Sequence, residues 1–423
     1  MALENCNETL LGCTRCSYCK WIPFAHVKSW RFAKGCPSVD FKKFHTYSAG
    51  GKLSAALSFL ENRSTYSDKL QEIAFECQLC GLCDVNCKIC RYDMEPLETL
   101  HELRFKLVEG GHSLPKHQTI INNLKKEGNS VMKPGNKRGD WAESLNVKDL
   151  TRESADVVFH AGCKLSFDKN LQKTARTAIS LLIKNGVDVG VMGKNEYCCG
   201  GRAYDMGFKE EFVVAAKKNI DLWTKAGVKT IVTSCSHCYH AFKRLYPKIG
   251  SDFIVLHTVE VIDNLIKENK IKFTGTVPLK VTYHDPCHLG RQGEPYIPWD
   301  GTKKKVFAQI TKYEPPKPRY LGAWGIYDPP RNILKAIPGL KLVEMERVKE
   351  YSWCCGAGSG VREAYPDFAK WTASERIEEA KATGAEALVT ACPWCESNFS
   401  DVTGADSQIL KVYDIIDLVE QAI

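Results

Sequence analysis

The sequence predicts an α + α/β fold, with a helical N-terminal part followed by two α/β units. In the first 125 residues, apolar positions recur at helical spacing over 52–62 and 95–109, and no alternating strand pattern appears. From residue 155 onward, apolar strands alternate with helical segments, which is typical of a mostly parallel sheet. This order of strands, helices and cysteines then repeats, so the sequence predicts an internal duplication.

The same patterns divide the chain into domains. Residues 1–125 are expected to form the helical domain, and residues 126–154, rich in Gly, Asn, Pro and charge, to form a linker or surface arm. The first α/β unit is placed at 155–270 and the second at 279–423. Glycines after the predicted helices suit left-handed C-terminal caps, and these glycines are Gly186, Gly227 and Gly384.

The composition is typical of a globular cytoplasmic protein. The 423 residues are 44% hydrophobic, which suffices for two or three domains with cores of their own. There is no run of about 18 apolar residues, so we expect no direct insertion into a membrane. The N-terminus has neither a basic nor an apolar signal region, which favours a cytoplasmic location.

Cysteine is the unusual component of this chain. Cytoplasmic thiols stay reduced unless a metal binds them, and a chain of this size does not need a disulfide scaffold. The twenty cysteines fall into four groups of five along the sequence: Cys6, Cys13, Cys16, Cys19, Cys36; Cys77, Cys80, Cys83, Cys87, Cys90; Cys163, Cys198, Cys199, Cys235, Cys238; and Cys287, Cys354, Cys355, Cys392, Cys395. The grouping predicts metal binding in both halves of the chain.

The first two groups contain the spacing of a two-cluster ferredoxin. Three cysteines spaced by two residues can hold three irons of a cubane, while the fourth cysteine usually ligates the other cluster. This rule predicts one [4Fe–4S] cubane on Cys13, Cys16, Cys19 and Cys87, and a second on Cys77, Cys80, Cys83 and Cys36. Zinc also uses paired cysteines, but it requires four ligands and not a triple with a crossing fourth.

Two departures from that spacing concern the crossing ligands. Sixteen residues separate Cys19 from Cys36, where three are usual, and no proline follows Cys87. Cys36 and Cys87 are therefore less firmly assigned than the two triples. We interpret Cys6 and Cys90 as bystanders or packing residues and not as ligands, because a free cysteine packs as a small hydrophobe.

Each α/β unit carries an adjacent cysteine pair followed by glycine. Neighbouring side chains of an extended chain diverge, so both sulfurs face one centre only where the backbone bends, as Gly200, Gly201 and Gly356 allow. Five thiolates exceed what zinc or a cubane needs, which suggests an enlarged or split cluster. The second unit has a longer interval before its pair, and we interpret the proline-rich residues 294–338 as an inserted loop.

The remaining motifs argue against other kinds of partner. The formal charge of +8 would be offset by four clusters of about −2 each, and no dense lysine run indicates nucleic acid. The Gly-rich segment after Cys355 lacks the Lys-Ser or Lys-Thr of a phosphate loop, so nucleotide binding is not expected. Four histidines near the cysteines are interpreted as ordering their loops, with proton transfer or tuning of potential as the alternative: His160, His237, His284 and His288.

Taken together, the motifs resemble the D-type subunit family of heterodisulfide reductase over nearly the whole chain. That resemblance implies a two-cubane ferredoxin domain fused to two cysteine-rich CCG domains. It implies that each CCG set of five cysteines holds a noncubane [4Fe–4S] cluster, although some CCG domains bind zinc instead. In the methanogen enzymes of this family, two noncubane clusters face each other and cleave a disulfide between them.

The stretched first motif, CTRCSYCKWIPF…SWRFAKGCPS, has a narrower resemblance. It is similar to the heterodisulfide-reductase-like subunit of the class II benzoyl-CoA reductase complex of strict anaerobes. This resemblance implies an electron relay between flavin- and iron–sulfur-containing subunits and a catalytic module. A catalytic disulfide reductase and a zinc-stabilised assembly scaffold are the alternatives.

Overall fold

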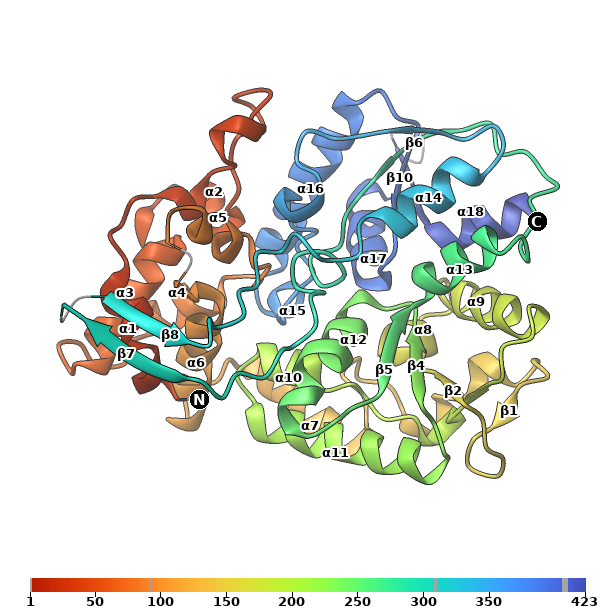
Figure 1. Ribbon diagram of the computed structural model, residues 1–423, viewed down its shortest axis with the longest axis horizontal. Helices are drawn as coiled ribbons and strands as arrows, with labels where there is room; N and C mark the ends of the chain where they lie inside the picture. The colour runs from red at the N-terminus through yellow and green to blue at the C-terminus, as the bar shows by residue number, and fades with distance from the viewer. Residues whose placement is uncertain (1, 92, 308–309, 405–409) are drawn as a thin grey trace.

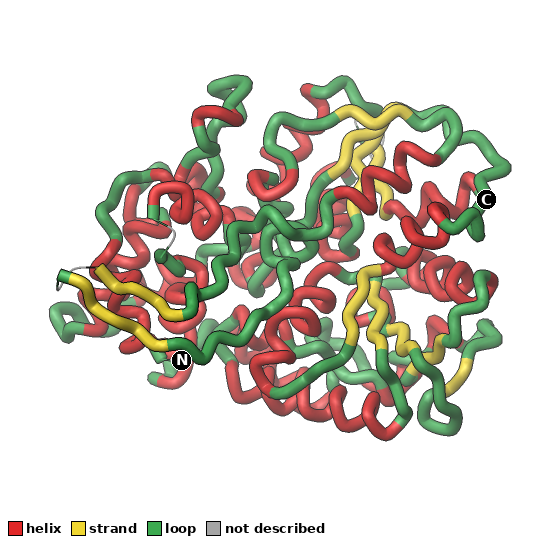
Figure 2. The backbone as a smooth tube through the Cα atoms, viewed as in Figure 1, coloured by secondary structure: helices red, strands yellow, loops and turns green. Residues whose placement is uncertain are grey.

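The computed structural model describes residues 2–91, 93–307, 310–404 and 410–423. It consists of a helical N-terminal domain and two α/β units that lie one above the other beside it (Figure 1). Figure 2 shows that the strands of the α/β units form separate sheets, and that a third, two-stranded ribbon lies apart from them over the N-terminal domain.

The N-terminal domain is built from helices around the cysteine motifs. Its helices are α1 (Asn7–Gly12), α2 (Pro37–Lys42), α3 (Ala49–Leu60), α4 (Asp68–Phe75), α5 (Leu82–Cys90), α6 (Pro96–Glu109) and α7 (Pro115–Glu127). The predicted helices at 52–62 and 95–109 correspond to α3 and α6. The strand-like pairing among its described residues is an isolated bridge between Trp21 and Lys34. A small core of Leu and aromatic side chains joins α1, α3, α4 and α6.

The first unit is a parallel sheet in the order β1-β3-β2-β4-β5. Its strands are β1 (Lys148–Asp149), β2 (Val157–Phe159), β3 (Val189–Val191), β4 (Thr230–Thr233) and β5 (Ile254–His257). Its helices are α8 (Gly162–Phe167), α9 (Gln172–Lys184), α10 (Gly201–Asp205), α11 (Lys209–Lys225), α12 (Ser236–His240) and α13 (Thr258–Lys267). Gly186 and Gly227 adopt positive φ after α9 and α11, which confirms the predicted caps.

The second unit repeats this topology in the sheet β11-β10-β6-β9. Its strands are β6 (Lys280–Tyr283), β9 (Lys341–Val343), β10 (Ala387–Thr390) and β11 (Lys411–Asp414). Its helices are α14 (Asp328–Ala336), α15 (Val361–Ala364), α16 (Pro366–Ala382), α17 (Pro393–Thr403) and α18 (Ile415–Ala422). All pairings in both sheets are parallel, so the predicted duplication is confirmed. The last helix of each unit packs on the crossover helix of the other, α13 on α14 and α18 on α9.

The interpretation of residues 294–338 as one inserted loop is wrong at its C-terminal end. Residues 328–336 form α14, which connects β6 to β9 as α9 connects β2 to β3. Two of the prolines that suggested a loop, Pro329 and Pro330, occupy the first turn of α14, where a missing N–H costs nothing. The insertion proper precedes α14 and carries the antiparallel ribbon β7 (Thr302–Val306) and β8 (Ile310–Glu314).

The segment 126–154, expected to be a linker or surface arm, packs against the first unit. It supplies β1 to the edge of the sheet, and Trp141 and Leu150 are buried in the core of the α/β units. Arg138, in the middle of this segment, is 1% exposed. The segment therefore brings a buried cation to the carboxyl edge of the first sheet.

Candidate metal centres

The first N-terminal cysteine set surrounds a small cavity beside α3 and α5. Cys13, Cys16 and Cys19 line it from one side, and Cys87 lines it from α5. Burial raises the pKa of Cys87 to about 12, and the charges of the three other cysteines add to this effect. The structure therefore brings together the four cysteines that the crossing rule assigned to one cubane.

The second N-terminal set gathers Cys36 with the other triple. Burial raises the pKa of Cys36 to about 12, with Cys77 and Cys80 close enough to add to the shift. Burial also raises the pKa of Cys83, and the charges of Cys80, Cys77 and Cys36 add to this shift. The sixteen residues between Cys19 and Cys36 therefore do not displace Cys36 from its predicted neighbours. They form a loop whose ends are held by the Trp21–Lys34 bridge.

In each α/β unit the five cysteines contact one another in the same order. In the first unit, the contacts run from Cys163 through Cys198, Cys199 and Cys238 to Cys235. In the second unit, they run from Cys287 through Cys354, Cys355 and Cys395 to Cys392. The 67-residue interval that follows Cys287 therefore leaves this cysteine beside the other four of its set.

Two contacts connect these sets to each other and to the N-terminal domain. Cys235 of the first unit contacts Cys392, its counterpart in the second unit. Cys354 of the second unit contacts Cys80 of the N-terminal domain. Three of the four cysteine sets are thus joined through direct side-chain contacts.

The adjacent pairs fit because the glycine that follows them takes a left-handed conformation. Gly200 has φ +75° and Gly356 has φ +90°, a region that L side chains rarely adopt. At Gly356 a Cβ atom would lie 2.3 Å from the carbonyl oxygen of Ala369. Asn398 also donates a hydrogen bond to the carbonyl of Cys355, at 2.7 Å. The sharp bend that turns both sulfurs inward is therefore fixed by packing from α16 and α17.

A buried arginine faces the first unit's cysteines. Both terminal nitrogens of Arg138 lie 3.6 Å from the Sγ of Cys163, and its Nη2 donates to Glu196 at 2.9 Å. Glu196 also accepts from the backbone N–H groups of Ala161 and Gly162. Burial opposes ionisation of Glu196, but His160 and Arg138 lower its pKa below the usual value. Arg138 is therefore held in place by a charged partner and directed at a thiol.

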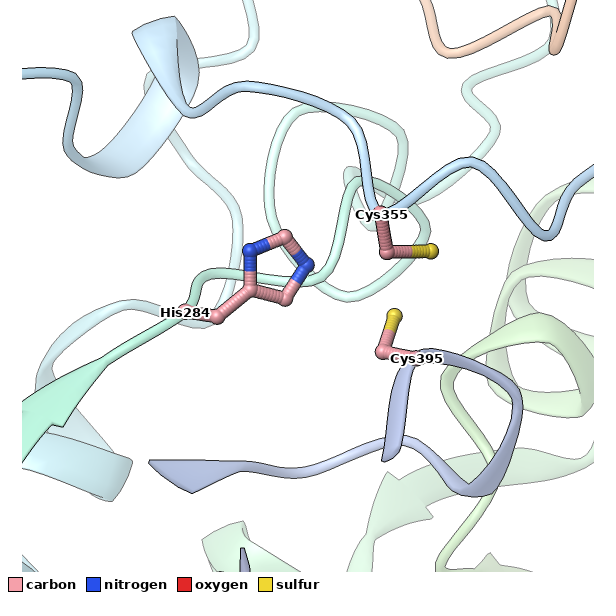
Figure 3. Close-up of side chains that lie close together, drawn as sticks. All are labelled: His284, Cys355 and Cys395. Atoms are coloured by element: carbon pink, nitrogen blue, oxygen red, sulfur yellow. The ribbon is translucent and has the colours of Figure 1, made fainter. Parts of the chain in front are cut away.

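The second unit has a different set of polar neighbours. His284, Cys355 and Cys395 come from three separate segments, and their ligand atoms lie within 4.8 Å of one another (Figure 3). Nε of Arg376 donates to Nδ1 of His284 at 3.2 Å, so the remaining proton of a neutral His284 is on Nε2. That nitrogen is buried, and among the described residues its polar neighbour is the thiol of Cys355. His284 is therefore oriented to donate a hydrogen bond toward the sulfurs. Its role thus goes beyond ordering its loop, the role that the sequence suggested.

A further polar cluster lies between the two units and the N-terminal domain. Asp205 Oδ1 lies 3.1 Å from His101, and Oδ2 lies 3.5 Å from His237 and 3.9 Å from His288. Burial opposes ionisation of Asp205, yet the surrounding histidines lower its pKa. Arg291 donates to the carbonyls of Cys80 and Ser352, so it links the N-terminal domain to the second unit.

Sequence reasoning missed Arg138, Asp205, Arg291 and Arg376. Their contacts in the structure are with residues far away in the sequence, such as Cys163 for Arg138, Cys80 for Arg291 and His284 for Arg376. The two cysteines left out of the sets are Cys6, buried in the small helical core, and Cys90, exposed at the end of α5. Cys6 thus lies where a packing cysteine is expected, and the exposed Cys90 lies where a bystander is expected.

The donor set fits iron–sulfur chemistry. Of the ten cysteines in the two units, all are buried except the half-buried Cys287. A tetrahedral zinc ion takes four ligands, so each unit offers one sulfur more than zinc can use. Soft thiolates in a dry, positively charged surrounding are suited to iron–sulfur clusters.

Comparison with known proteins agrees with this chemistry. A family described as "4Fe-4S dicluster domain" matches residues 9–89, and a family described as "Cysteine-rich domain" (CCG) matches residues 157–243 and 317–400. The second CCG match begins after Cys287, which the structure nevertheless places in the set. The fold and cysteines thus define an iron–sulfur protein with a dicluster domain and two CCG domains.

Relatives that match most of this chain identify the family to which it belongs. The chain is 30% identical to the D-type subunit of the "Dihydromethanophenazine:CoB--CoM heterodisulfide reductase" of Methanosarcina mazei, over 97% of this chain and 93% of that protein. It is 27% identical to "EtfAB:quinone oxidoreductase" of Syntrophomonas wolfei, over 86% of this chain and 48% of that protein. The chain therefore belongs to the heterodisulfide reductase D-type family of CCG-domain iron–sulfur proteins.

A solved structure supports the fold alone. The crystal structure of a hypothetical protein from Helicobacter pylori matches 89% of this chain and 67% of its own, with a TM-score of 0.53 and 12% identity. In the described part of the chain, no helix combines the length and apolar character needed to cross a membrane.

Proposed function

We propose that this chain is an electron-transfer subunit of a multi-subunit anaerobic oxidoreductase. It would hold two cubane [4Fe–4S] clusters in the N-terminal domain and one noncubane [4Fe–4S] cluster in each CCG domain. Such clusters, when bound, supply one-electron transfer at potentials tuned by their surroundings. The ligands would be the four cysteine sets described above, with Cys87 and Cys36 crossing between the N-terminal motifs.

The observation that carries this proposal is the continuous arrangement of the four sets. Cys83 and Cys87 stand one turn apart on α5, about 6 Å along its axis, and belong to different N-terminal sets. Cys80 contacts Cys354, and Cys392 contacts Cys235. The chain thus offers a path from the N-terminal domain through the second CCG domain to the first.

Exposure indicates where electrons would enter from another protein. Cys16 is exposed, whereas the cysteines of the CCG domains are buried apart from half-buried Cys287. A protein-sized donor would therefore reach the first N-terminal set more easily than the CCG sets. Flavin- and iron–sulfur-containing subunits are the proposed partners, and the stretched first motif favours a benzoyl-CoA reductase-type complex.

Disulfide reduction is the second candidate function. It is favoured by a small cavity between the two CCG domains, which is lined by Cys287 and Cys392 of the second set and by His237 of the first domain. The name of the Methanosarcina relative refers to a heterodisulfide reductase. An assay of disulfide substrates with an artificial electron donor separates this function from a relay, which would show no such turnover.

The relay is tested by mixing the anaerobic holoprotein with reduced flavodoxin, a donor too large to reach buried cysteines. We expect Cys83→Ser to leave reduction of the first cubane intact and to slow reduction of both CCG clusters, as followed by freeze-quench EPR. The matched control is Cys90→Ser, which changes an exposed cysteine on the same helix. Equal CCG reduction rates in Cys83→Ser and Cys90→Ser would rule out the proposed path.

A further inference from the structure

A cavity of about 420 Å³ lies where three parts of the chain meet, apart from the cysteine sets. Helix α6 of the N-terminal domain forms one wall, and the segment after α12 in the first CCG domain forms another. The insertion of the second CCG domain closes the third side with Tyr296, Trp299 and Tyr320. This volume is within the range of about 300–1,000 Å³ that is usual for small-molecule sites.

The wall from the first CCG domain presents a guanidinium group on an aromatic ring. The Arg244 side chain stacks over the ring of Tyr320 at 3.6 Å from its centroid. Among the described residues, no carboxylate pairs with Arg244 and no hydrogen bond engages its nitrogens. A stacked, planar guanidinium keeps its hydrogen-bonding edge available, and that edge matches a carboxylate, sulfonate or phosphate.

The opposite wall presents three carboxyl groups with different surroundings, those of Glu95, Glu98 and Glu102. Glu98 is paired with Lys248 at 3.3 Å, so its charge is compensated. Glu102 is 5% exposed, and no hydrogen bond or ion pair connects its carboxyl group to a described residue. Burial raises the pKa of Glu102 to about 7. Buried polar groups normally have a partner, so Glu102 is available to a hydrogen-bonding group of a ligand.

The insertion of the second CCG domain is fixed by hydrogen bonds to the N-terminal domain. Tyr313 donates to Glu8 at 2.6 Å, and Lys88 of α5 donates to the carbonyl of Tyr320 at 3.0 Å. The same lysine bonds Glu95 on the cavity wall at 2.9 Å. The aromatic wall is therefore fixed before a ligand arrives, and it is fixed to the helix that carries Cys83 and Cys87.

We propose that this cavity binds a small planar aromatic molecule that carries one anionic group. The ring stacks between the aromatic side chains of the insertion, the anionic group bonds the free edge of Arg244, and Glu102 bonds a polar substituent. Aromatic stacking and a charge-assisted hydrogen bond together explain why the guanidinium group of one wall lies against the aromatic rings of the neighbouring wall. The site is independent of the electron relay.

Naphthalene-2-sulfonate serves as the probe, titrated by calorimetry into anaerobic holoprotein. We expect saturable binding of one probe per chain, and binding weakened about tenfold or more by Arg244→Gln through loss of a charge-assisted bond. The matched control is Lys272→Gln, which removes an exposed positive charge outside the cavity. Cyclohexanesulfonate, with the same charge and no aromatic ring, should bind much more weakly than the probe.

A second variant guards against a merely misfolded protein. Tyr320→Leu removes the ring on which Arg244 stacks and should also weaken binding, while the absorbance of the clusters stays at the wild-type level in all variants used. The proposal is overturned if the probe shows no saturable binding, if Arg244→Gln binds it as tightly as Lys272→Gln does, or if cyclohexanesulfonate binds equally well.

Discussion

Replacing Gly356 with alanine should remove the cluster of the second CCG domain. An added Cβ would lie 2.3 Å from the carbonyl oxygen of Ala369, whereas real Cβ contacts are essentially never under 3.0 Å. The backbone after Cys355 must therefore move by about 0.7 Å, the difference between these two distances. Metal–ligand distances tolerate only about 0.2 Å, so the two adjacent sulfurs would no longer fit one cluster.

Gly227→Ala is the matched control for this substitution. Gly227 has φ +73°, close to the +90° of Gly356, but no atom lies within 4 Å of its added Cβ. The left-handed conformation alone costs about 1–2 kcal/mol in either variant. We expect Gly227→Ala to have a slightly lower melting temperature than the wild type and to keep all its iron.

The assay is iron content after anaerobic purification, with EPR to identify which cluster is lost. Gly356→Ala should lose about four irons per chain, the content of one cluster, and the first CCG domain should keep its signal. If Gly356→Ala retained as much iron as Gly227→Ala, the bend at Gly356 would not be what brings the adjacent sulfurs together.

Three further predictions follow from the cysteine sets and their neighbours. Cys87→Ser should damage the cluster of Cys13, Cys16 and Cys19; an EPR change confined to the cluster of Cys77, Cys80 and Cys83 would contradict the crossing. Removal of iron should unfold residues 1–125 first, because ligand formation supplies much of that domain's folding free energy; proteolysis that cut the CCG domains and spared this domain would refute it. Arg138→Gln should lower the reduction potential of the first CCG cluster, because a positive charge 3.6 Å from Cys163 favours the added electron; a redox titration that gave the wild-type potential, as expected for the exposed Arg152→Gln, would exclude that role.

Local patterns predicted the parts of the fold that local forces determine. The helical spacing of apolar residues predicted α3 and α6, and the glycines that follow them predicted where α9, α11 and α16 end. The repeated order of strands and cysteines gave two parallel sheets of the same topology. The proline pair in the first turn of α14 misled the interpretation, because proline is common both in loops and in the first turn of a helix.

The surroundings of the cysteines could not be predicted in the same way. Arg138 comes from a polar segment that looks like a linker, and its burial depends on Glu196, 58 residues away. Arg376 contacts His284 across 92 residues. The contacts between sets, Cys80 with Cys354 and Cys235 with Cys392, arise only when separate domains pack. Such pairings depend on tertiary structure and leave no periodic signal in the sequence.

The central claim is that all four cysteine sets hold iron–sulfur clusters, including both CCG sets. Metal analysis of the anaerobically purified protein tests it most directly. Four four-iron clusters require about 16 irons per chain, with zinc well below one. Stoichiometric zinc together with about 12 irons would instead mean that one CCG domain is a structural zinc site, and the continuous relay through both CCG domains would be refuted.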